Sequence, residues 1–484
     1  MIGLHTADEV RAAEAPLLAA GPEGALMQRA ATGLATVCLR LLGRAHGTRV
    51  TALVGAGDNG GDALFAGAQL AARGARVTAV LLDPDRAHPA GLARLRRAGG
   101  RVAGPDGPTG LDRADLVLDG ITGLGGRGGL RPEAAALVVR AAAGPGLMVA
   151  VDLPSGVDPD TGAVAGRAFP AQHTVTFGAV KAGLVVGEGR QHAGQVHLVD
   201  IGLAGTLPRP RAVRLTDDDV AARLEPPTDA DDKYSRGVVG IVAGSATYPG
   251  AAVLCTGAAL RTRPGLVRYA GTAAAGVRAA WPEAIVTEGR PSDAGRVQAW
   301  VVGPGMGTDD GAADVVAEVL ATDLPVLLDA DALTLVARRP DLVRDRTAPT
   351  VLTPHDREFA RFGQDVGADR IGAARRLAAD LGAVVLLKGA ATIVAAPDGP
   401  AFVNGTGTPE LATAGTGDVL SGIAGALLAA GLPAAEAAAT AAHVHGRAGQ
   451  LAAEGGPLIA GDLVRRLPRT LARLRRGSGA GLGD

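Results

Sequence analysis

The sequence predicts an α/β protein with two halves, each built on a parallel sheet. Short apolar runs typical of buried strands alternate with stretches of helical periodicity from residue 49 onward. Glycine-rich or carboxylate-bearing segments follow these runs directly, as expected where parallel strands bind ligands at their carboxyl ends. The alternation stops over residues 203–232, a proline-rich and acidic stretch, and then starts again. The chain of 484 residues therefore divides into two domains.

The composition argues against several classes of partner. Lysine and arginine total 48 against 49 for aspartate and glutamate, so the net charge of −1 gives no electrostatic basis for binding nucleic acid or an anionic membrane. Cys38 and Cys255 lie far apart in apolar segments, which fits a reducing cytosol and no disulfide framework. A signal-peptide pattern and an apolar run of membrane-spanning length are both absent from the sequence. We expect a cytoplasmic protein, and we also expect a homo-oligomer.

The elements of the first half follow a regular order. Two helices are predicted over residues 6–44, interrupted at Gly21-Pro22. The next predicted elements are a strand at 49–54, a glycine loop at 55–62, a helix at 63–73, and strands at 76–82, 116–119, 147–152, 174–177 and 196–201. Strand, loop, helix and strand form a parallel crossover unit. Asp119 and Asp152 end two of the strands, so we expect both at the sheet edge that carries the glycine loop.

The glycine loop allows two interpretations. Residues 55–60 match G-x-G-x-x-G, and Asp83 ends the next strand, which by itself indicates a dinucleotide dehydrogenase. The loop continues, however, as Asn59-Gly60-Gly61-Asp62, whose side chains suit a monovalent cation and hydroxyl groups better. Two further loops follow Asp119 and Asp152, at 123–129 and 152–158. Three such loops after three strands indicate a binding site rather than simple turns.

Together with Thr176–Leu184, these segments resemble the NAD(P)H-hydrate epimerase family. The resemblance implies a Rossmann-like, three-layer domain over residues 1–208 that interconverts the R and S hydrates of NADH and NADPH. It implies K⁺ held by Asn59, Asp119 and Ser155, with Asp152 and Lys181 as candidate catalytic residues. The implied substrate contacts are Asp58, Asn59, Gly60, Gly61, Asp62, Gly123, Leu124, Gly125, Gly126, Arg127, Gly128, Gly129 and Asp152. The family usually has Asn and Gly where this chain has Asp58 and Ala63, and Asp58 adds negative charge near the expected phosphates.

The second half begins after a linker expected over residues 209–232. A strand at 238–243 leads into Gly244–Ala252 and a helix that runs through Leu260. Further strands are predicted at 299–302, 325–328, 350–352 and 383–387, followed by a hairpin over 392–403. His355 and Lys388 follow two of these strands. Lys388 is one of only three lysines in the chain and can neutralise a nucleotide phosphate.

The turn Gly415-Thr416-Gly417-Asp418 precedes an apolar helix and supports two interpretations. Small residues at a helix start leave N–H groups free to hold a phosphate, and Asp418 would then take a proton from an attacking hydroxyl. Asp418 is explained equally well as the cap of a helix that begins at Val419. A Walker-type nucleotide motif does not occur in the sequence. His443 and His445 would face different directions on a helix, so they do not predict a metal site.

The ordered motifs of this half resemble the ribokinase-like superfamily, and within it the ADP- or ATP-dependent NAD(P)H-hydrate dehydratases. The motifs are Gly-Ser-x-x-Tyr-Pro-Gly-Ala, Gly-Pro-Gly-Met-Gly, Asp-Ala-Asp-Ala-Leu, Thr-Pro-His-x-x-Glu, Lys-Gly-Ala-Ala-Thr and Ala-Gly-Thr-Gly-Asp. The resemblance implies a dehydratase domain over residues 233–484 that uses ADP, with ATP as the alternative, together with Mg²⁺. It places the hydrate at Ala251, Gly305, Gly307, His355 and the catalytic Asp418. It places the nucleotide at Lys388, Gly389, Ala390, Ala391, Thr392, Gly415, Thr416 and Gly417.

The sequence thus predicts a bifunctional repair enzyme whose small-molecule substrates are the hydrates NADHX and NADPHX. A ribokinase-like small-molecule kinase of the hydroxymethylpyrimidine type, with a nucleotide-binding first half, is the alternative. It would share Asp418 but release a stable phosphorylated product. A purely nucleotide-binding role for the first half is the other open interpretation, and Asp58 favours it slightly. A loop histidine without a role is the alternative for His355.

Overall fold

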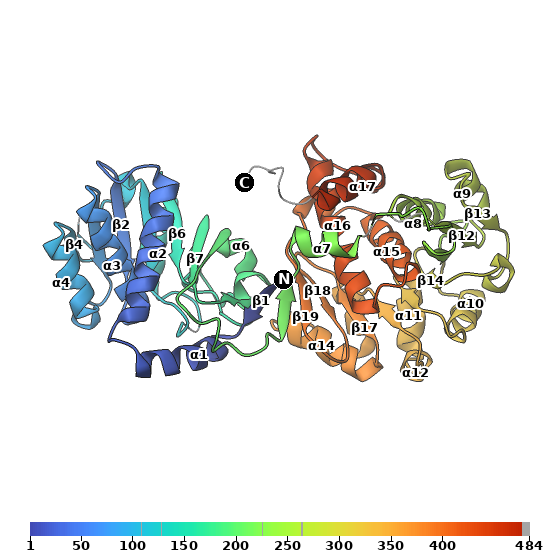
Figure 1. The fold of residues 1–484 in the computed structure, drawn as a ribbon, viewed down its shortest axis with the longest axis horizontal. Coiled ribbons are helices and arrows are strands. Elements are labelled where there is room, and N and C mark those ends of the chain that lie inside the picture. Colours follow the sequence, from blue (N-terminus) through green and yellow to red (C-terminus); the bar gives the residue numbers. More distant parts are fainter. Residues whose placement is uncertain (108, 127, 225, 263–264, 477–484) are drawn as a thin grey trace. The chain divides into compact units, whose positions relative to one another are not determined.

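The computed structural model describes residues 1–484 except 108, 127, 225, 263–264 and 477–484. The chain forms two compact units: the first unit is Gly3–Arg211, and the second unit is Ala212–Asp484 with Met1–Ile2. Figure 1 shows that each unit contains a sheet flanked by helices. The predicted α/β fold class is therefore confirmed.

The first unit is built on a seven-stranded parallel sheet in the order β4-β3-β2-β5-β6-β7-β9. Its strands are β2 (Arg49–Val54), β3 (Arg76–Leu81), β4 (Arg101–Ala103), β5 (Leu116–Gly120), β6 (Leu147–Val151), β7 (His173–Phe177) and β9 (Gln195–Val199). The chain adds strands outward from β2 through β3 to β4 and then returns to β5 on the other side. Such a reversal opens a crevice at the carboxyl ends of β2 and β5. A separate parallel pair joins β1 (Ile2–His5) to β8 (Val180–Lys181).

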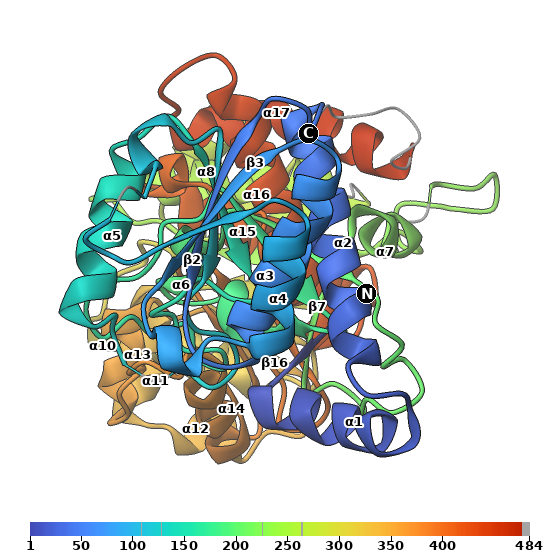
Figure 2. The same cartoon turned by 90° about the vertical axis from the view of Figure 1, so that its left-hand side faces the viewer.

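Helices cover both faces of this sheet, as Figure 2 shows for α2, α3 and α4 on one side and α5 on the other. The helices are α1 (Ala7–Ala20), α2 (Ala25–Leu42), α3 (Asp58–Ala72), α4 (Pro89–Arg97), α5 (Pro132–Ala142) and α6 (Gly189–Ala193). One buried cluster joins residues of α1 to α4 to one sheet face, and a second joins α5 to the opposite face. The strands are apolar throughout because both of their faces are covered.

The second unit has a sheet in the order β13-β12-β11-β14-β15-β16-β17-β18-β19-β10. Its strands are β11 (Val238–Val242), β12 (Leu266–Ala270), β13 (Ile285–Thr287), β14 (Ala299–Val302), β15 (Val326–Leu328), β16 (Thr350–Leu352), β17 (Val384–Leu387), β18 (Thr392–Ala395), β19 (Ala401–Asn404) and β10 (Ala212–Arg214). The strands from β13 to β17 are parallel, whereas β18 is antiparallel to both neighbours, as the predicted hairpin requires. The sequence did not predict β12 and β13 because they are short and contain polar residues.

The helices of the second unit again flank the sheet. They are α7 (Asp217–Arg223), α8 (Pro249–Thr262), α9 (Ala274–Ala280), α10 (Asp310–Leu320), α11 (Asp331–Arg338), α12 (Asp341–Arg344), α13 (Asp356–Phe359), α14 (Arg370–Leu381), α15 (Thr416–Ala429), α16 (Ala434–Ala453) and α17 (Ala460–Arg475). One large core joins α7, α8, α15, α16 and α17 to the sheet. Helix α15 lies at its centre, with nearly all of its residues buried.

Glycines allow α15 to lie close to its neighbours. A Cβ on Gly422 would overlap the backbone of Cys255 in α8, and a Cβ on Gly425 would overlap Val301 in β14. We expect Gly425→Ala to destabilise the fold by about 1–3 kcal/mol, because Val301 lies in a packed strand and cannot move aside. Urea unfolding of the full chain checks this value. The matched control is Gly250→Ala, which is expected to leave the unfolding midpoint unchanged, because a Cβ at Gly250 would meet no atom within 4 Å and its φ is negative. Gly431 also has open space around it, but its positive φ would strain an alanine.

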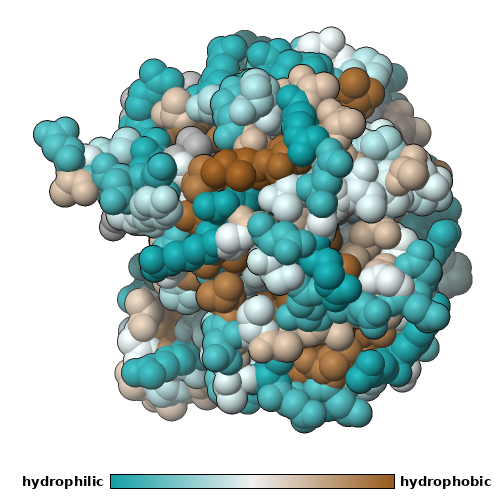
Figure 3. All heavy atoms as spheres, turned by 90° about the vertical axis from the view of Figure 1, so that its right-hand side faces the viewer, coloured by the Kyte–Doolittle hydropathy of each residue, from teal (hydrophilic) through white to brown (hydrophobic). Residues whose placement is uncertain are grey.

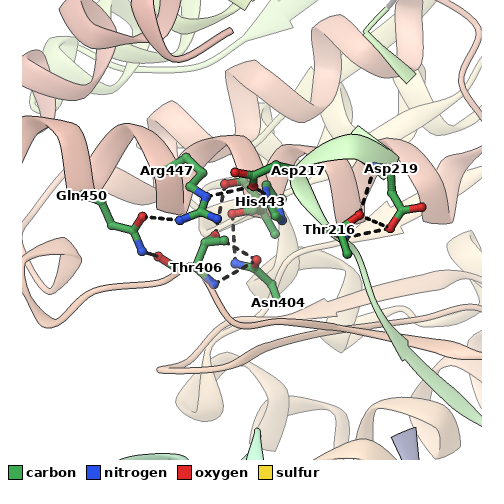
Figure 4. A network of polar contacts seen from close by, with 9 residues as sticks. Thr216, Asp217, Asp219, Asn404, Thr406, His443, Arg447 and Gln450 are labelled. Atoms are coloured by element: carbon green, nitrogen blue, oxygen red, sulfur yellow. Dashed lines mark hydrogen bonds and ion pairs between the residues drawn. The ribbon is translucent and has the colours of Figure 1, made fainter. Parts of the chain in front are cut away.

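Part of the expected linker belongs to the second unit. Within residues 209–232, β10 pairs with β19 and α7 docks on α16, as Figure 4 shows. Asp217 accepts hydrogen bonds at 2.6 Å from His443 and at 2.9 Å from Arg447. Thr216 and Asp219 form a capping box that starts α7. The boundary between the units therefore falls at residue 212, because β10 pairs with β19 and the amphipathic helix α7 packs against α16 and α17.

The described surface of the second unit is mixed in character. Figure 3 shows that the side carrying α9 and α10 has many hydrophilic residues and also apolar groups, the most extended of which forms a row in the upper part of the view. Ile285 in β13 is one of the exposed large apolar side chains. Within the described ranges, no helix combines the length and apolar character needed to cross a membrane.

Candidate active sites

The three glycine-bearing loops of the first unit meet at the carboxyl edge of its sheet. Helix α3 begins at Asp58, not at Ala63 as predicted, so Asn59, Gly60, Gly61 and Asp62 lie in its first turns. The glycines were taken for a loop because they have low helix propensity, but their N–H groups form the helix start. A Cβ on Gly123 would lie 3.0 Å from Asn59 Oδ1, so the loop over 123–129 lies against α3. Of the predicted contacts in this loop, Arg127 lies outside the described residues.

The three predicted K⁺ ligands are brought together beneath these loops. Ser155 donates to Asp119 through Oγ at 2.7 Å and through its backbone N–H at 2.8 Å. Asp119 is fully buried, and burial raises its pKa to about 6. Asn59 is also buried, and its side-chain nitrogen has no partner among the described residues. Among the described residues, Asp119 has no ion pair, and the Asn59 amide oxygen, the Ser155 hydroxyl and this carboxylate are hard oxygen ligands of the kind that fits a cation.

Asp152 and Lys181 form a buried ion pair beside this edge. Lys181 Nζ lies 2.5 Å from Asp152 Oδ1, and both side chains are at most 9% exposed. Lys181 also donates to the Phe177 carbonyl at 2.9 Å. Asp152 has a φ of 62°, a strained value for a residue with a side chain. The structure therefore joins the two residues that the sequence proposed separately as acid or base, and backbone strain at a functional site is a recurring pattern.

Two cavities open near this edge. One of about 340 Å³ is lined by Gly55, Gly125, Gly126, Gly129 and Gly156 together with Arg86 and Arg131. The other, of about 500 Å³, lies among α1, α2, α3 and α4. Its polar lining residues are Glu14, Glu23, Gln28, Asp58, Asp62 and His88, and the rest of its lining is mainly apolar. Sequence reasoning missed Glu14, Arg86 and Arg131. Arg86 follows the end of β3, and Arg131 follows the glycine loop over 123–129. A basic residue in these positions is the sequence signal that could have identified them.

In the second unit, Asp418 lies in the first turn of α15 and is not its cap. The helix begins at Thr416, and the residue before it, Gly415, adopts a φ of 86°. The interpretation of Asp418 as a helix cap is therefore wrong, because the turn is left-handed at Gly415 and the helix starts earlier than Val419. Burial, followed by the nearby charges of Asp329 and Asp331, raises the pKa of Asp418 to about 7, while Lys388 opposes the shift. Such a carboxyl can exchange protons near neutral pH.

Lys388 lies at the carboxyl end of β17 next to Gly417. Its Nζ is 2.8 Å from Asp329 and 3.6 Å from Glu358. Burial acts to lower the pKa of Lys388, but the two carboxylates outweigh it and raise the pKa. A Cβ on Gly417 would lie 3.8 Å from this nitrogen, so the cation lies directly beside the α15 start. Asp329 and Glu358 were not predicted as site residues, although each stands within a quoted motif after a strand.

The remaining predicted hydrate contacts gather around the same edge. Gly307 donates its N–H to Asp331 at 2.9 Å, and a Cβ on Gly305 would lie 3.0 Å from the Cβ of Ala251. His355 is exposed and caps α13, since its Nδ1 accepts from the N–H groups of Arg357 and Glu358. The other ring nitrogen, Nε2, lies 3.6 Å from Glu358 Oε1, so the exposed ring stays close to the carboxylate that also contacts Lys388.

The predicted nucleotide contacts divide into two groups. Gly389 and Ala390 are exposed after β17, Ala391 is buried, and Thr392 begins β18. The Thr416 hydroxyl donates to the carbonyls of Leu411 and Thr413, at 2.9 and 3.0 Å, so it fixes the turn rather than facing a ligand. His443 and His445 face different directions, as predicted: His443 contacts Asp217, and His445 Nε2 donates to the Thr416 carbonyl at 2.9 Å. Burial lowers the pKa of His445 to about 4, so the ring is neutral.

Two family models match the chain. A model described as NAD(P)H-hydrate dehydratase matches residues 239–471, and one described as YjeF-related protein N-terminus matches residues 23–183. Among solved structures, a ribokinase-like superfamily protein from Enterococcus faecalis V583 is 26% identical with a TM-score of 0.50, covering 54% of this chain and 96% of that one. This similarity confirms the ribokinase-like fold.

Two curated relatives extend the similarity over almost the whole chain. The relative from Mycobacterium leprae (strain TN) is 52% identical over 472 residues, which cover 96% of this chain and 97% of the relative. The relative from Mycobacterium tuberculosis (strain CDC 1551 / Oshkosh) is 54% identical over 442 residues, covering 90% and 91%. Both are named bifunctional NAD(P)H-hydrate repair enzyme Nnr. With both family models matched and similarity of this extent, the chain belongs to the family of bifunctional NAD(P)H-hydrate repair enzymes.

Proposed function

We propose that the second unit dehydrates the S hydrate of NADH and NADPH with ADP, releasing AMP and phosphate, and that the first unit converts the R hydrate into the S hydrate. The observation that carries the first activity is the half-buried Asp418 in the first turn of α15, beside Gly417 and Lys388. The names of the two mycobacterial relatives support the pairing of activities.

In the second unit, Asp418 takes the proton of the ring hydroxyl. The hydroxyl oxygen then bonds to the terminal phosphorus of ADP, and the bond from that phosphorus to the oxygen bridging to AMP breaks. The backbone N–H groups at the α15 start, from Gly415 to Gly417, hold the transferring phosphoryl group. The phosphate then leaves carbon 6 with its electron pair, the ring nitrogen supplies the compensating electrons, and loss of the carbon 5 proton completes the dihydropyridine. Mg²⁺ would accompany the nucleotide as counterion of its phosphates.

In the first unit, the Asp152–Lys181 pair lies where the ring of the hydrate is proposed to bind. Asn59, Asp119 and Ser155 would hold K⁺, which would supply positive charge next to the substrate phosphates and fix the loops that bind them. We also propose that the enzyme acts in the cytoplasm as a homo-oligomer, which light scattering of the purified chain checks.

The proposed function is tested by incubating the purified chain with separated R and S hydrates. We expect NADH absorbance to return from the S hydrate when ADP is present, and from the R hydrate at a rate set by epimerisation. Replacing ADP with ATP measures the nucleotide preference. A stable phosphorylated product without NADH would instead establish the kinase alternative. Failure to convert the R hydrate faster than the buffer alone would reduce the first unit to a binding module.

Potassium is expected to stabilise the first unit. Because burial raises the pKa of Asp119, its ionised form is unfavourable until a cation compensates it. We expect the thermal unfolding midpoint of the full chain to rise with KCl but not with tetramethylammonium chloride at equal ionic strength. Asp119→Asn should abolish this difference. An exposed carboxylate at the other end of β5, Asp112, provides the matched control, and Asp112→Asn should leave the K⁺ response intact.

A further inference from the structure

Of the four acidic residues that line the cavity of about 500 Å³, Asp62 is the one that is buried and has a carboxylate oxygen without a described hydrogen-bond partner. Asp62 is only 8% exposed, and its Oδ1 has no hydrogen-bond partner among the described residues. It nevertheless lines the cavity of about 500 Å³, together with the apolar side chains of Leu18, Met27 and Phe177. A carboxyl group in such a place is costly as an anion and inexpensive as a neutral acid.

The charged and titratable groups near Asp62 come from several segments around the cavity, whereas α2 contributes the uncharged Gln28 and apolar side chains. They are Glu14 of α1, Glu23 before α2, Asp58 of α3, His88 of α4, Asp152 after β6 and Lys181 of β8. Burial first, and then the negative charges of Asp152, Asp58 and Glu14, raise the pKa of Asp62 well above its usual value. Lys181 opposes this, but its Nζ is engaged by Asp152 at 2.5 Å. His88 Nδ1 accepts from the Gly91 N–H, so its ring does not provide a proton from that nitrogen.

Asp152 is in the opposite situation. It receives three donors on one oxygen: Lys181 Nζ, the Thr176 hydroxyl and the Phe177 N–H all bond to Oδ1. These contacts compensate a negative charge and leave Oδ2 for another proton. One carboxyl group is buried with no described hydrogen bond at Oδ1, and the other is held by three donors; acid–base enzymes place their two carboxyl groups in such contrasting environments.

We propose that Asp62 is the general acid of the epimerase and Asp152 is the general base, so that water leaves one face of the ring and enters at the other. This inference rests on the proposed function of the first unit. It goes beyond it by assigning a catalytic role to Asp62, for which the resemblance implied only substrate binding.

Each turnover balances in protons and electrons. Asp62 gives its proton to the hydroxyl on carbon 6 of the R hydrate, the carbon–oxygen bond breaks with its electrons on oxygen, and water leaves. The lone pair of the ring nitrogen forms a carbon–nitrogen double bond. A water on the opposite face then bonds to carbon 6, its proton passes to Asp152 Oδ2, and the electrons of the double bond return to nitrogen. Solvent returns the proton from Asp152 to Asp62, and the reverse reaction uses the two groups in exchanged roles.

The test compares Asp62→Asn with the wild-type chain. Epimerisation is measured without nucleotide, by chromatographic separation of R and S hydrates, and dehydration of the S hydrate is measured separately with ADP. We expect Asp62→Asn to slow epimerisation by about 100-fold or more, the range for loss of a general acid, and to leave S-hydrate dehydration unchanged. Asp112→Asn should leave both rates unchanged. Epimerisation by Asp62→Asn within threefold of wild type would overturn the proposal and leave the proposed function intact.

The pH profile separates a catalytic role from a structural one. If Asp62 must be protonated, epimerisation by the wild-type chain decreases as the pH rises through the pKa of Asp62, whereas S-hydrate dehydration does not follow the same limb. Asp62→Glu should retain measurable epimerisation and move that limb. An alkaline limb that is absent in the wild type, or that stays in place in Asp62→Glu, would overturn the assignment even if Asp62→Asn fails to fold.

Discussion

Asp418→Asn is expected to stop NADH formation from the S hydrate and ADP while R and S hydrates continue to interconvert. The amide keeps the size of the side chain but cannot accept the hydroxyl proton, so kcat for dehydration should fall by about 100- to 10,000-fold. The measurement is NADH absorbance with the purified S hydrate and saturating ADP. The matched control is Asp365→Asn, since Asp365 is an exposed carboxylate of the same unit without a described contact, and its variant should behave as wild type.

The pH dependence of dehydration follows from the same group. A base must be ionised, and the pKa of Asp418 is about 7, so kcat/KM should decrease tenfold per pH unit below about 7 and become constant above it. The sign for stability is opposite: because burial raises the pKa, the folded chain loses stability as the pH rises from about 4 toward 7 and this group ionises. A rate independent of pH between 5 and 8 would contradict the role of Asp418 as base.

Lys388→Met is expected to have the second-largest effect, on both stability and activity. Removing this cation leaves Asp329 and Glu358 without their charge partner in a buried site, which should cost about 3–5 kcal/mol of unfolding free energy. The KM for ADP should rise, because the cation next to Gly417 is lost. Urea unfolding and the absorbance assay measure the two effects.

The pH profile of Lys388→Met gives an independent check. Lys388 lowers the pKa of Asp418, so its removal should move the acidic limb of dehydration to higher pH. The matched control is Lys233→Met, because Lys233 is exposed and its described contact is with the ring of Tyr234. A Lys388→Met chain with wild-type stability and an unchanged acidic limb would show that Asp329 and Glu358 are neutralised in another way.

Local sequence pattern was sufficient to predict most of the strands and helices and the segments that carry the candidate site residues. The apolar strand runs, the glycine loops after β2, β5 and β6, and the turn before α15 can each be recognised from residues close together in the sequence. The predicted start of α3 was wrong. Glycine has low helix propensity, so Gly60 and Gly61 were assigned to a loop, although the packing of α3 on the sheet stabilises them as helix.

The sequence by itself determined that two α/β units carry glycine loops and carboxylates at the ends of parallel strands, since strand periodicity and turn chemistry are local properties. Only the tertiary structure decided which of these charged groups form ion pairs with one another. Lys388 lies 59 residues from its partner Asp329 in the sequence and Lys181 lies 29 residues from Asp152, while no described residue bonds to Asp62 Oδ1. Protonation depends on burial and on distances between residues remote in the chain, and these are fixed only when the strands have taken their order in the sheet.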